Sequence, residues 1–386
     1  MSASSTVRVN VNPRLVQWAR ERVGWGLTER VIHRFPHLLA WEQGVTQPTL
    51  RQLEQFAHAV HVPIGYLFLQ GPPEEDVPIP DLRTVADRPI EHPSPELLDT
   101  IYLCQQRQEW YQDHLRFQRA DPLGFVGSAT VASDIAATGA TIRQALGFGV
   151  EERRQMPSWT DALRRFIEQA DALGVLVMAN GVVGNNTHRK LDPDEFRGFA
   201  LSDRYAPLVF INGADTKAAQ MFTLAHELAH IWLGASALSD AKPAVTPTNI
   251  VERWCNQVAA EVLVPLATFR EVYRHDDELR LTLDRLARYF KVSTLVILRR
   301  LFDAGYLTRA QLAEAYSAEV ERLHAIPRGS GGNFYLTQGA RVGKRFARAV
   351  VGSTLEGQTL YRDALHLLAF SKTATFHELA HSLGMA

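Results

Sequence analysis

Residues 222–230 read Phe-Thr-Leu-Ala-His-Glu-Leu-Ala-His and contain the pattern His-Glu-x-x-His. On a helix, His226 and His230 lie one above the other on the same face, because they are four positions apart. Two imidazoles placed in this way can ligate one Zn²⁺ and leave a coordination position open for water. Glu227 points to the neighbouring side, where its carboxylate can accept a proton from that water. The apolar neighbours indicate a buried helix, and such a helix can also hold two histidines without a metal.

A hydrolytic zinc site needs a third protein ligand, and two carboxylates lie in residues 251–265, Val-Glu-Arg-Trp-Cys-Asn-Gln-Val-Ala-Ala-Glu-Val-Leu-Val-Pro. Apolar residues recur there at helical spacing, which predicts a second amphipathic helix. We favour Glu252 as the ligand over Glu261, because Glu261 lies two and a half turns further along and on another face. Asn256 follows Glu252 by one turn, where it could orient a ligand or be an ordinary surface amide.

Together, these two segments resemble the ImmA/IrrE family of metallo-endopeptidases over roughly residues 160 to 310. The resemblance implies that His226, His230 and Glu252 bind zinc and that Glu227 is the general base. It implies a regulatory protease that cleaves a partner protein, such as a helix-turn-helix repressor, in a stress, phage or mobile-element response. Three positions depart from the family pattern, and we expect them to change packing only: Trp254, Cys255 and Val258.

The same five-letter motif occurs again at His377–His381, near the end of the chain. Only five residues follow His381, so no downstream helix can supply a carboxylate. We therefore expect a short terminal helix and interpret the repeat as a coincidence. A metal shared with another chain of an oligomer is the other interpretation.

The composition is typical of a globular protein, with 46% hydrophobic and 22% charged residues and a net charge of −1. This charge excludes a chain that binds nucleic acid through its overall potential, so any basic patch must be local. Cys104 and Cys255 lie in apolar helical patterns and are predicted to be reduced core residues. No apolar leader and no run of transmembrane length is visible, so we expect a cytoplasmic protein without membrane contact. The oligomeric state stays open.

Residues 1–70 are predicted to form a small helical module. The order of its helices and the sequence Trp41-Glu-Gln-Gly44 resemble Xre/Cro-type helix-turn-helix modules, which would place a third helix in the DNA major groove. The segment Leu27–Trp41 is shorter than is usual for the type, and Pro36 lies where the recognition helix should begin. DNA binding and a role in packing or partner binding are therefore both open. Residues 71–95 are rich in proline and are predicted to be a linker or an arm that lies on another domain.

Residues 96–150 are predicted to be a helical connector, and residues 151–270 the zinc metallopeptidase domain. A helix is expected at Trp159–Ala172, strands at Gly174–Met178, Phe196–Leu201 and Pro207–Asn212, and a flexible loop at Gly181–Asn186. An edge strand beside the zinc would bind a peptide by main-chain hydrogen bonds, which favours a peptide substrate. Three residues are candidates for stabilising the oxyanion: Tyr205, Tyr273 and His275.

Residues 271–325 have a helix-turn-helix-like layout with a turn at Phe290–Ser293, and they are locally basic. This basic segment could bind DNA or a DNA-bound substrate, or be a solvated face on a packing unit. Seven residues make it basic: Arg280, Arg285, Arg288, Lys291, Arg299, Arg300 and Arg309. Residues 326–386 are predicted to form a glycine-rich hinge at 326–332 and a helical tail.

The predicted fold class is mainly α with a small β-sheet (α+β), a zincin-like catalytic domain flanked by helix-turn-helix-like modules. Two function classes follow from these patterns. The first is a zinc endopeptidase with a protein substrate, and the second is a DNA-binding regulator or antitoxin-like partner with a structural or vestigial metal site. The ligand set favours the first class, while the N-terminal module keeps DNA open as a partner.

Overall fold

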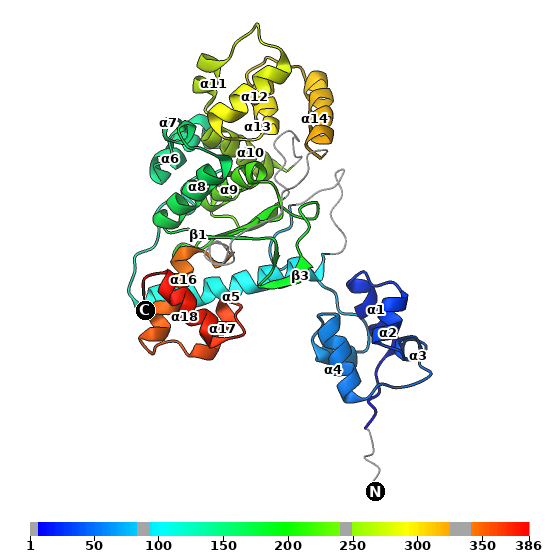
Figure 1. Ribbon diagram of the computed structural model, residues 1–386. Coiled ribbons are helices and arrows are strands. Elements are labelled where there is room, and N and C mark those ends of the chain that lie inside the picture. The colour runs from blue at the N-terminus through cyan, green and yellow to red at the C-terminus, as the bar shows by residue number, and fades with distance from the viewer. Residues whose placement is uncertain (1–6, 83–92, 240–248, 325–340, 386) are drawn as a thin grey trace. The chain divides into compact units, whose positions relative to one another are not determined.

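The computed structural model describes residues 7–82, 93–239, 249–324 and 341–385 (Figure 1). Residues 1–6, ten residues of the predicted linker (83–92), residues 240–248 and the predicted hinge at 326–332 lie outside the described residues. The described chain is mainly helical with a small sheet, which confirms the α+β class. It divides into two compact units, one made of residues 7–78 and 93–99, the other of 79–82 and the described residues from 100 onward.

The first unit has its own helical core. Leu15, Leu53 and Phe56 are fully buried in it, and Thr49 and Gln52 form a capping box at the start of α4. Its elements are α1 (Pro13–Arg22), α2 (Glu29–Arg34), α3 (Leu38–Glu42), α4 (Leu50–Ala59) and the 3₁₀ helix η1 (Ile64–Phe68). The predicted order of short helices is thus present, and α2 and α3 are the shortest α-helices of the unit.

The second unit is built on a four-stranded sheet in the order β1-β5-β4-β6. Strands β1 and β5 are parallel, whereas β4 is antiparallel to both β5 and β6. The strands are β1 (Leu176–Asn180), β4 (Gly198–Leu201), β5 (Leu208–Asn212) and β6 (Ala237–Ser239). The first three confirm the predicted strands, which carry continuous apolar runs because both faces of the sheet are buried.

Two predictions for this sheet were wrong or incomplete. The expected flexible loop at Gly181–Asn186 is part of a hairpin, in which β2 (Val182–Val183) pairs with β3 (Asn186–Lys190). The sequence analysis also missed β6, which has only three residues and is fully buried.

Helices cover both faces of the sheet (Figure 1). On one face lie α8 (Trp159–Leu173) and α9 (Lys217–Leu233), and on the other lie α5 (Pro95–Phe117) and the C-terminal helices. The amide of Gln108 on α5 donates to the main-chain oxygens of Leu201 and Ala206 at the rim of the sheet. The tail is held by a similar contact, because Arg107 on α5 donates to the main-chain oxygen of Leu367. The helices of the tail are α16 (Lys344–Leu355), α17 (Tyr361–Leu367) and α18 (Thr373–Ser382).

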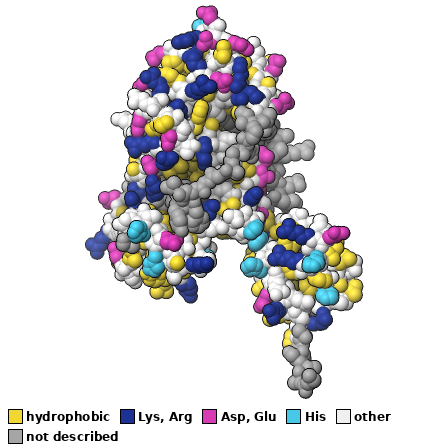
Figure 2. Space-filling model, in the orientation of Figure 1, with side chains coloured by type: hydrophobic (Ala, Val, Ile, Leu, Met, Phe, Trp, Pro, Cys, Tyr) yellow, Lys and Arg dark blue, Asp and Glu magenta, His cyan; other side chains and the backbone are white. Residues whose placement is uncertain are grey.

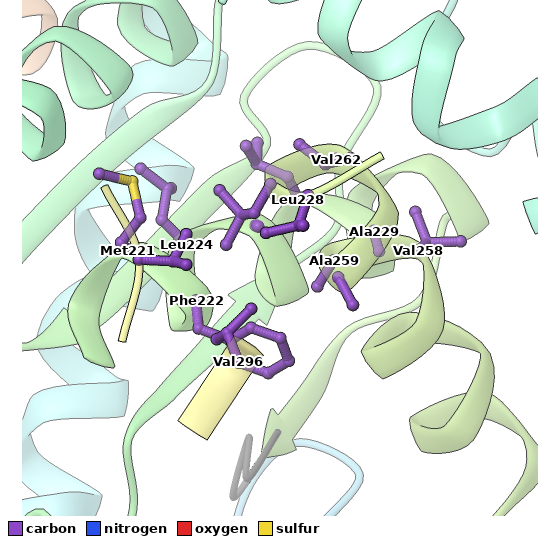
Figure 3. Close-up of a cluster of buried hydrophobic side chains, with 14 of the residues drawn as sticks. Met221, Phe222, Leu224, Leu228, Ala229, Val258, Ala259, Val262 and Val296 are labelled. Carbon is purple, nitrogen blue, oxygen red and sulfur yellow. The ribbon is translucent and has the colours of Figure 1, made fainter. Parts of the chain in front are cut away.

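The helices that carry the two sequence motifs pack face to face. Helix α10 (Ile250–Leu263) lies against α9, and Leu228 and Ala229 of α9 meet Val258 and Ala259 of α10 in one apolar cluster (Figure 3). The alanines leave room for the helix backbones to approach closely. This packing fixes the distance between the two motifs.

The remaining helices extend the same core. Val296 and Leu298 of α13 are fully buried in the cluster that contains α9 and α10. The turn predicted at Phe290–Ser293 is present between α12 and α13, with Lys291 at φ 52°. The helices of this region are α6 (Ile135–Leu146), α7 (Val150–Arg154), α11 (Leu266–Val272), α12 (Leu279–Phe290), α13 (Thr294–Asp303) and α14 (Arg309–His324).

Candidate metal centre

Three side chains from α9 and α10 bring their donor atoms to one point. His230 Nε2 lies 3.1 Å from His226 Nε2 and 3.0 Å from Glu252 Oε1. His226 Nε2 lies 3.4 Å from Glu252 Oε2. Among the residues that the structure describes, these three form the one group of histidine, cysteine and acidic side chains with metal-binding geometry.

The donor set fits a zinc ion. Ligands at about 2.0–2.1 Å from a tetrahedral ion are about 3.3 Å from one another, close to the three separations observed. Two imidazoles and one carboxylate are also the ligands of many hydrolytic zinc sites, which keep a fourth position for water. A cation at this point would bind all three donors at once, whereas two imidazole nitrogens so close together otherwise need a proton between them.

The ends of the two helices hold the ligands in place. Thr216 caps the start of α9 by accepting from the Ala219 N–H, and Gly234 ends the helix at φ 70°. Asn249 caps α10 through the N–H groups of Val251 and Glu252. Glu252 thus lies in the first turn of its helix, where the helix dipole stabilises a carboxylate.

The C-terminal end of α10 is fixed by two arginines from neighbouring helices. Arg143 donates to the main-chain oxygen of Glu261, and the fully buried Arg153 donates to that of Leu263. Cations at a helix C-terminus satisfy free carbonyl groups and favour the dipole. The Glu261 side chain accepts from Arg300 at 2.8 Å and does not belong to the group of His226, His230 and Glu252. This rival of Glu252 is therefore an ion-pair partner and not part of the cluster.

Glu227 lies beside the ligands, in a narrow space between α9 and the sheet. Its carboxylate is fully buried, and Oε2 accepts from the Ser239 hydroxyl at 3.3 Å, while Oε1 has no hydrogen-bond partner among the described residues. Ser239 is opposite Gly198 in the pairing of β6 with β4. The catalytic candidate thus faces the end of the sheet where β4 and β6 meet.

The two histidines and two glutamates of the site shift one another's pKa values. Burial raises the pKa of Glu227 to about 8. Burial would also raise the pKa of Glu252, but His226 and His230 lower it to about 2. Burial lowers the pKa of His230. At His226 burial also lowers the pKa, but Glu252, Glu227 and Asn256 together outweigh it, so the pKa of His226 is raised. The carboxylate of Glu252 is therefore ionised at neutral pH, as a metal ligand must be.

Asn256 lies next to the site, as its spacing predicted. Its side chain contributes to the raised pKa of His226, although Asn256 Oδ1 and His226 Nδ1 are not in regular hydrogen-bond geometry. Both atoms are buried. An amide oxygen that accepts from His226 Nδ1 would fix the tautomer of a ligating histidine.

Substitution of Gly198 tests how closely β4 packs against α9 at the site. A Cβ at this position would lie 2.6 Å from Thr223 Cγ2 and 3.1 Å from Glu227 Oε1. We expect Gly198→Ala to lower the free energy of unfolding by about 1–3 kcal/mol, because overpacking forces α9 away from β4. Thermal unfolding of the metal-free protein measures this. Gly124→Ala is the matched control, since nothing lies within 4 Å of its added Cβ, and equal destabilisation by both would contradict the close packing.

The three residues proposed to stabilise the oxyanion pack against other aromatic and basic side chains. Tyr273 stacks on Tyr306 with ring centroids 4.1 Å apart, and His275 packs edge-on against the same pair. Tyr205 lies within 6.0 Å of the guanidinium of Arg116. In the described structure, no hydrogen bond, ion pair or ring contact joins these three side chains to the metal ligands, and their role in oxyanion binding stays a prediction.

The second His-Glu-x-x-His motif lies on α18. His377, Glu378 and His381 are all exposed, whereas Phe376 and Leu379 face the core of the tail. No third ligand joins them in the described part of the chain. The interpretation of the repeat as a coincidence stays a prediction.

The predicted basic segment uses most of its arginines internally. Arg280 pairs with Glu319 at 2.9 Å, Arg285 with Asp277 at 3.1 Å, and the buried Arg300 with Glu261. On the face shown in Figure 2, blue and magenta side chains alternate over α11–α14 instead of forming a continuous basic patch. In the N-terminal unit, α3 exposes Leu39, a side chain that cannot hydrogen-bond to a base. These observations add no support to DNA binding by either part.

Both cysteines are free and buried, as predicted, and burial raises the pKa of the Cys104 thiol to about 12. None of the helices in the described residues has the length and apolar character needed to span a bilayer.

Comparison with known proteins agrees with this geometry. Residues 342–382, the tail helices, match a domain of unknown function (DUF8813). No curated protein matches the chain. Residues 170–302, from the end of α8 to α13, match the IrrE N-terminal-like domain (Peptidase_M78), and the part of the chain that carries His226, Glu227, His230 and Glu252 is thus similar to an ImmA/IrrE-type peptidase domain.

Proposed function

We propose that this protein is a zinc-dependent endopeptidase that cleaves a partner protein. The observation that carries the proposal is the convergence of His226, His230 and Glu252 beside a buried carboxylate, Glu227. The two histidines and Glu252 would hold the ion. Bound there, zinc would act as a Lewis acid and lower the pKa of a water molecule.

The chain's own groups would then move the proton. Glu227 would take a proton from the attacking water and later give it to the leaving amine, as a general base and acid. The Ser239 hydroxyl donates to Glu227 Oε2 and so leaves the lone pairs of Oε1 for that proton. The three ligands and Glu227 are all buried. Burial excludes bulk water and so strengthens each electrostatic interaction in the site.

A peptide is the substrate class that the fold favours. Strand β6 ends at Ser239, in contact with Glu227, and a peptide that adds to a sheet by main-chain hydrogen bonds would be carried to the reacting carboxylate. The family resemblance supports a regulatory protein as substrate, such as a helix-turn-helix repressor in a stress, phage or mobile-element response.

The test uses zinc-loaded protein and candidate repressors encoded in the same genome. Each candidate is incubated with the protein, and new termini are identified by mass spectrometry. We expect cleavage of one or a few candidates, its loss after treatment with a chelator, and its return after zinc is added. Cleavage that persists in the chelated, metal-free protein would exclude the proposed chemistry.

A further inference from the structure

The outer edge of the sheet is occupied by a segment from the proline-rich stretch. We call Ile79–Leu82 the arm. Leu238 donates its N–H to the Pro80 oxygen at 2.9 Å, and Leu82 donates its N–H to the Leu238 oxygen at 3.0 Å. Asp81 and Leu238 form a parallel bridge. The arm thus takes both main-chain groups that the middle residue of β6 offers at this edge, as one extra strand would.

The arm runs toward the catalytic carboxylate. Because the pairing is parallel, Leu82 lies alongside Ser239, one position beyond the bridge at Leu238. Ser239 Oγ is 3.3 Å from Glu227 Oε2. The bridge between the arm and β6, at Leu238, is therefore one residue from Ser239, whose hydroxyl contacts Glu227.

The site is closed in this state. His226, His230 and Glu227 are 0% exposed and Glu252 is 3% exposed, so no peptide can reach them without a movement of the chain. An extended peptide that docks on β6 would need the same N–H and carbonyl of Leu238 that the arm now occupies. One edge accepts one strand at a time.

We propose that the arm is an internal competitor of the substrate, and that the peptidase becomes active when the arm leaves β6. This inference rests on the proposed endopeptidase function. The arm suits such a role because it lies at the surface: Pro80 and Asp81 are exposed, and Ile79 is its one buried side chain. It is also tethered, and a tethered segment competes at an effective concentration on the order of millimolar, which keeps it bound until something removes it.

The test compares Leu82→Pro with the wild type, both loaded with zinc. Proline has no N–H and so removes one of the two hydrogen bonds to Leu238. The probe is a library of unstructured peptides, and mass spectrometry gives the cleavage rate. We expect an increase of about tenfold or more, since an arm bound for nine-tenths of the time leaves about one-tenth of the molecules competent. Exchange of the Leu238 amide with deuterium should accelerate in the same variant.

Asp76→Pro is the matched control, because Asp76 is exposed and precedes the arm in the same proline-rich stretch. It should cleave at the wild-type rate. Ile79→Ala removes the buried side chain of the arm and should also raise the cleavage rate. It keeps the test decisive if Leu82→Pro does not fold.

The outcomes separate the inference from the proposed function. Equal cleavage by wild type, Leu82→Pro and Ile79→Ala would show that the arm is a permanent strand, and would overturn the inference while the peptidase stands. Faster Leu238 exchange, with no cleavage of the peptide library or of any candidate repressor by any zinc-loaded form, would show that the arm is displaceable but that no peptidase activity depends on it. The proposed function and the inference would then both be wrong.

Discussion

Glu252→Gln is expected to reduce the zinc content of the purified protein from about one ion per chain to a trace, whereas Glu261→Gln leaves it unchanged. Glu252 offers its oxygens to both histidines at 3.0 and 3.4 Å, while Glu261 pairs with Arg300. An amide keeps the shape of the side chain but loses the charge that holds a dication. Because loss of an outer partner already costs about 10–100-fold in metal affinity, loss of a ligand should cost at least about a hundredfold.

Elemental analysis after dialysis, and competition with a zinc-binding dye, measure this effect. Thermal unfolding gives a second readout, since zinc at about a thousand times its wild-type Kd should stabilise the wild type by about 4 kcal/mol and Glu252→Gln by at most about 1.4 kcal/mol. His377→Ala serves as a further control and should keep its zinc. Loss of zinc from Glu261→Gln or His377→Ala, with retention in Glu252→Gln, would place the site elsewhere.

The part of the site that could be predicted is the part that local geometry determines. His226 and His230 share a face because of helical periodicity, and Glu252 was preferred over Glu261 for the same reason. The structure brings together the three residues that this argument selected. The strands β1, β4 and β5 could be found because their apolar runs are bounded by turn residues.

The proline-rich stretch was predicted to be a linker or an arm on another domain, but strand β6 and its pairing with the arm could not be predicted, because this pairing is non-local. Ala237–Ser239 is too short to show a period, and its hydrogen bonds go to residues 198–200 on one side and to residues 80–82 on the other. A strand of this kind is defined by its neighbours and not by its own sequence. The contact between Ser239 and Glu227 was missed for the same reason.

The charge of residues 271–325 shows a different limit of sequence analysis. Counting arginines predicted a basic face, but partners far along the chain neutralise several of them. Glu319, for example, accepts from Arg280, and Glu261 accepts from Arg300, in each case 39 positions away along the chain. A count of charges cannot tell a solvated arginine from one that holds two helices together.

Glu227→Gln is expected to lower the rate of substrate cleavage by about 10²–10⁴-fold while the zinc content stays at the wild-type value. A positioned general base contributes about this factor, and glutamine cannot accept the proton. The variant should fold, because burial raises the pKa of Glu227 to about 8 and the metal-free protein already favours a neutral group in this space. The cleavage rate of an identified substrate, with zinc measured on the same sample, gives the comparison.

Glu378→Gln is the matched control, because the chain carries the same five-residue motif twice and the two changes are chemically identical. Glu227 is fully buried beside two metal ligands, whereas Glu378 is exposed on α18. Only the first should lose activity, and neither should lose zinc. A similar loss in both variants would mean that the tail motif takes part in catalysis, and full activity in Glu227→Gln would leave the metal centre with a structural role only.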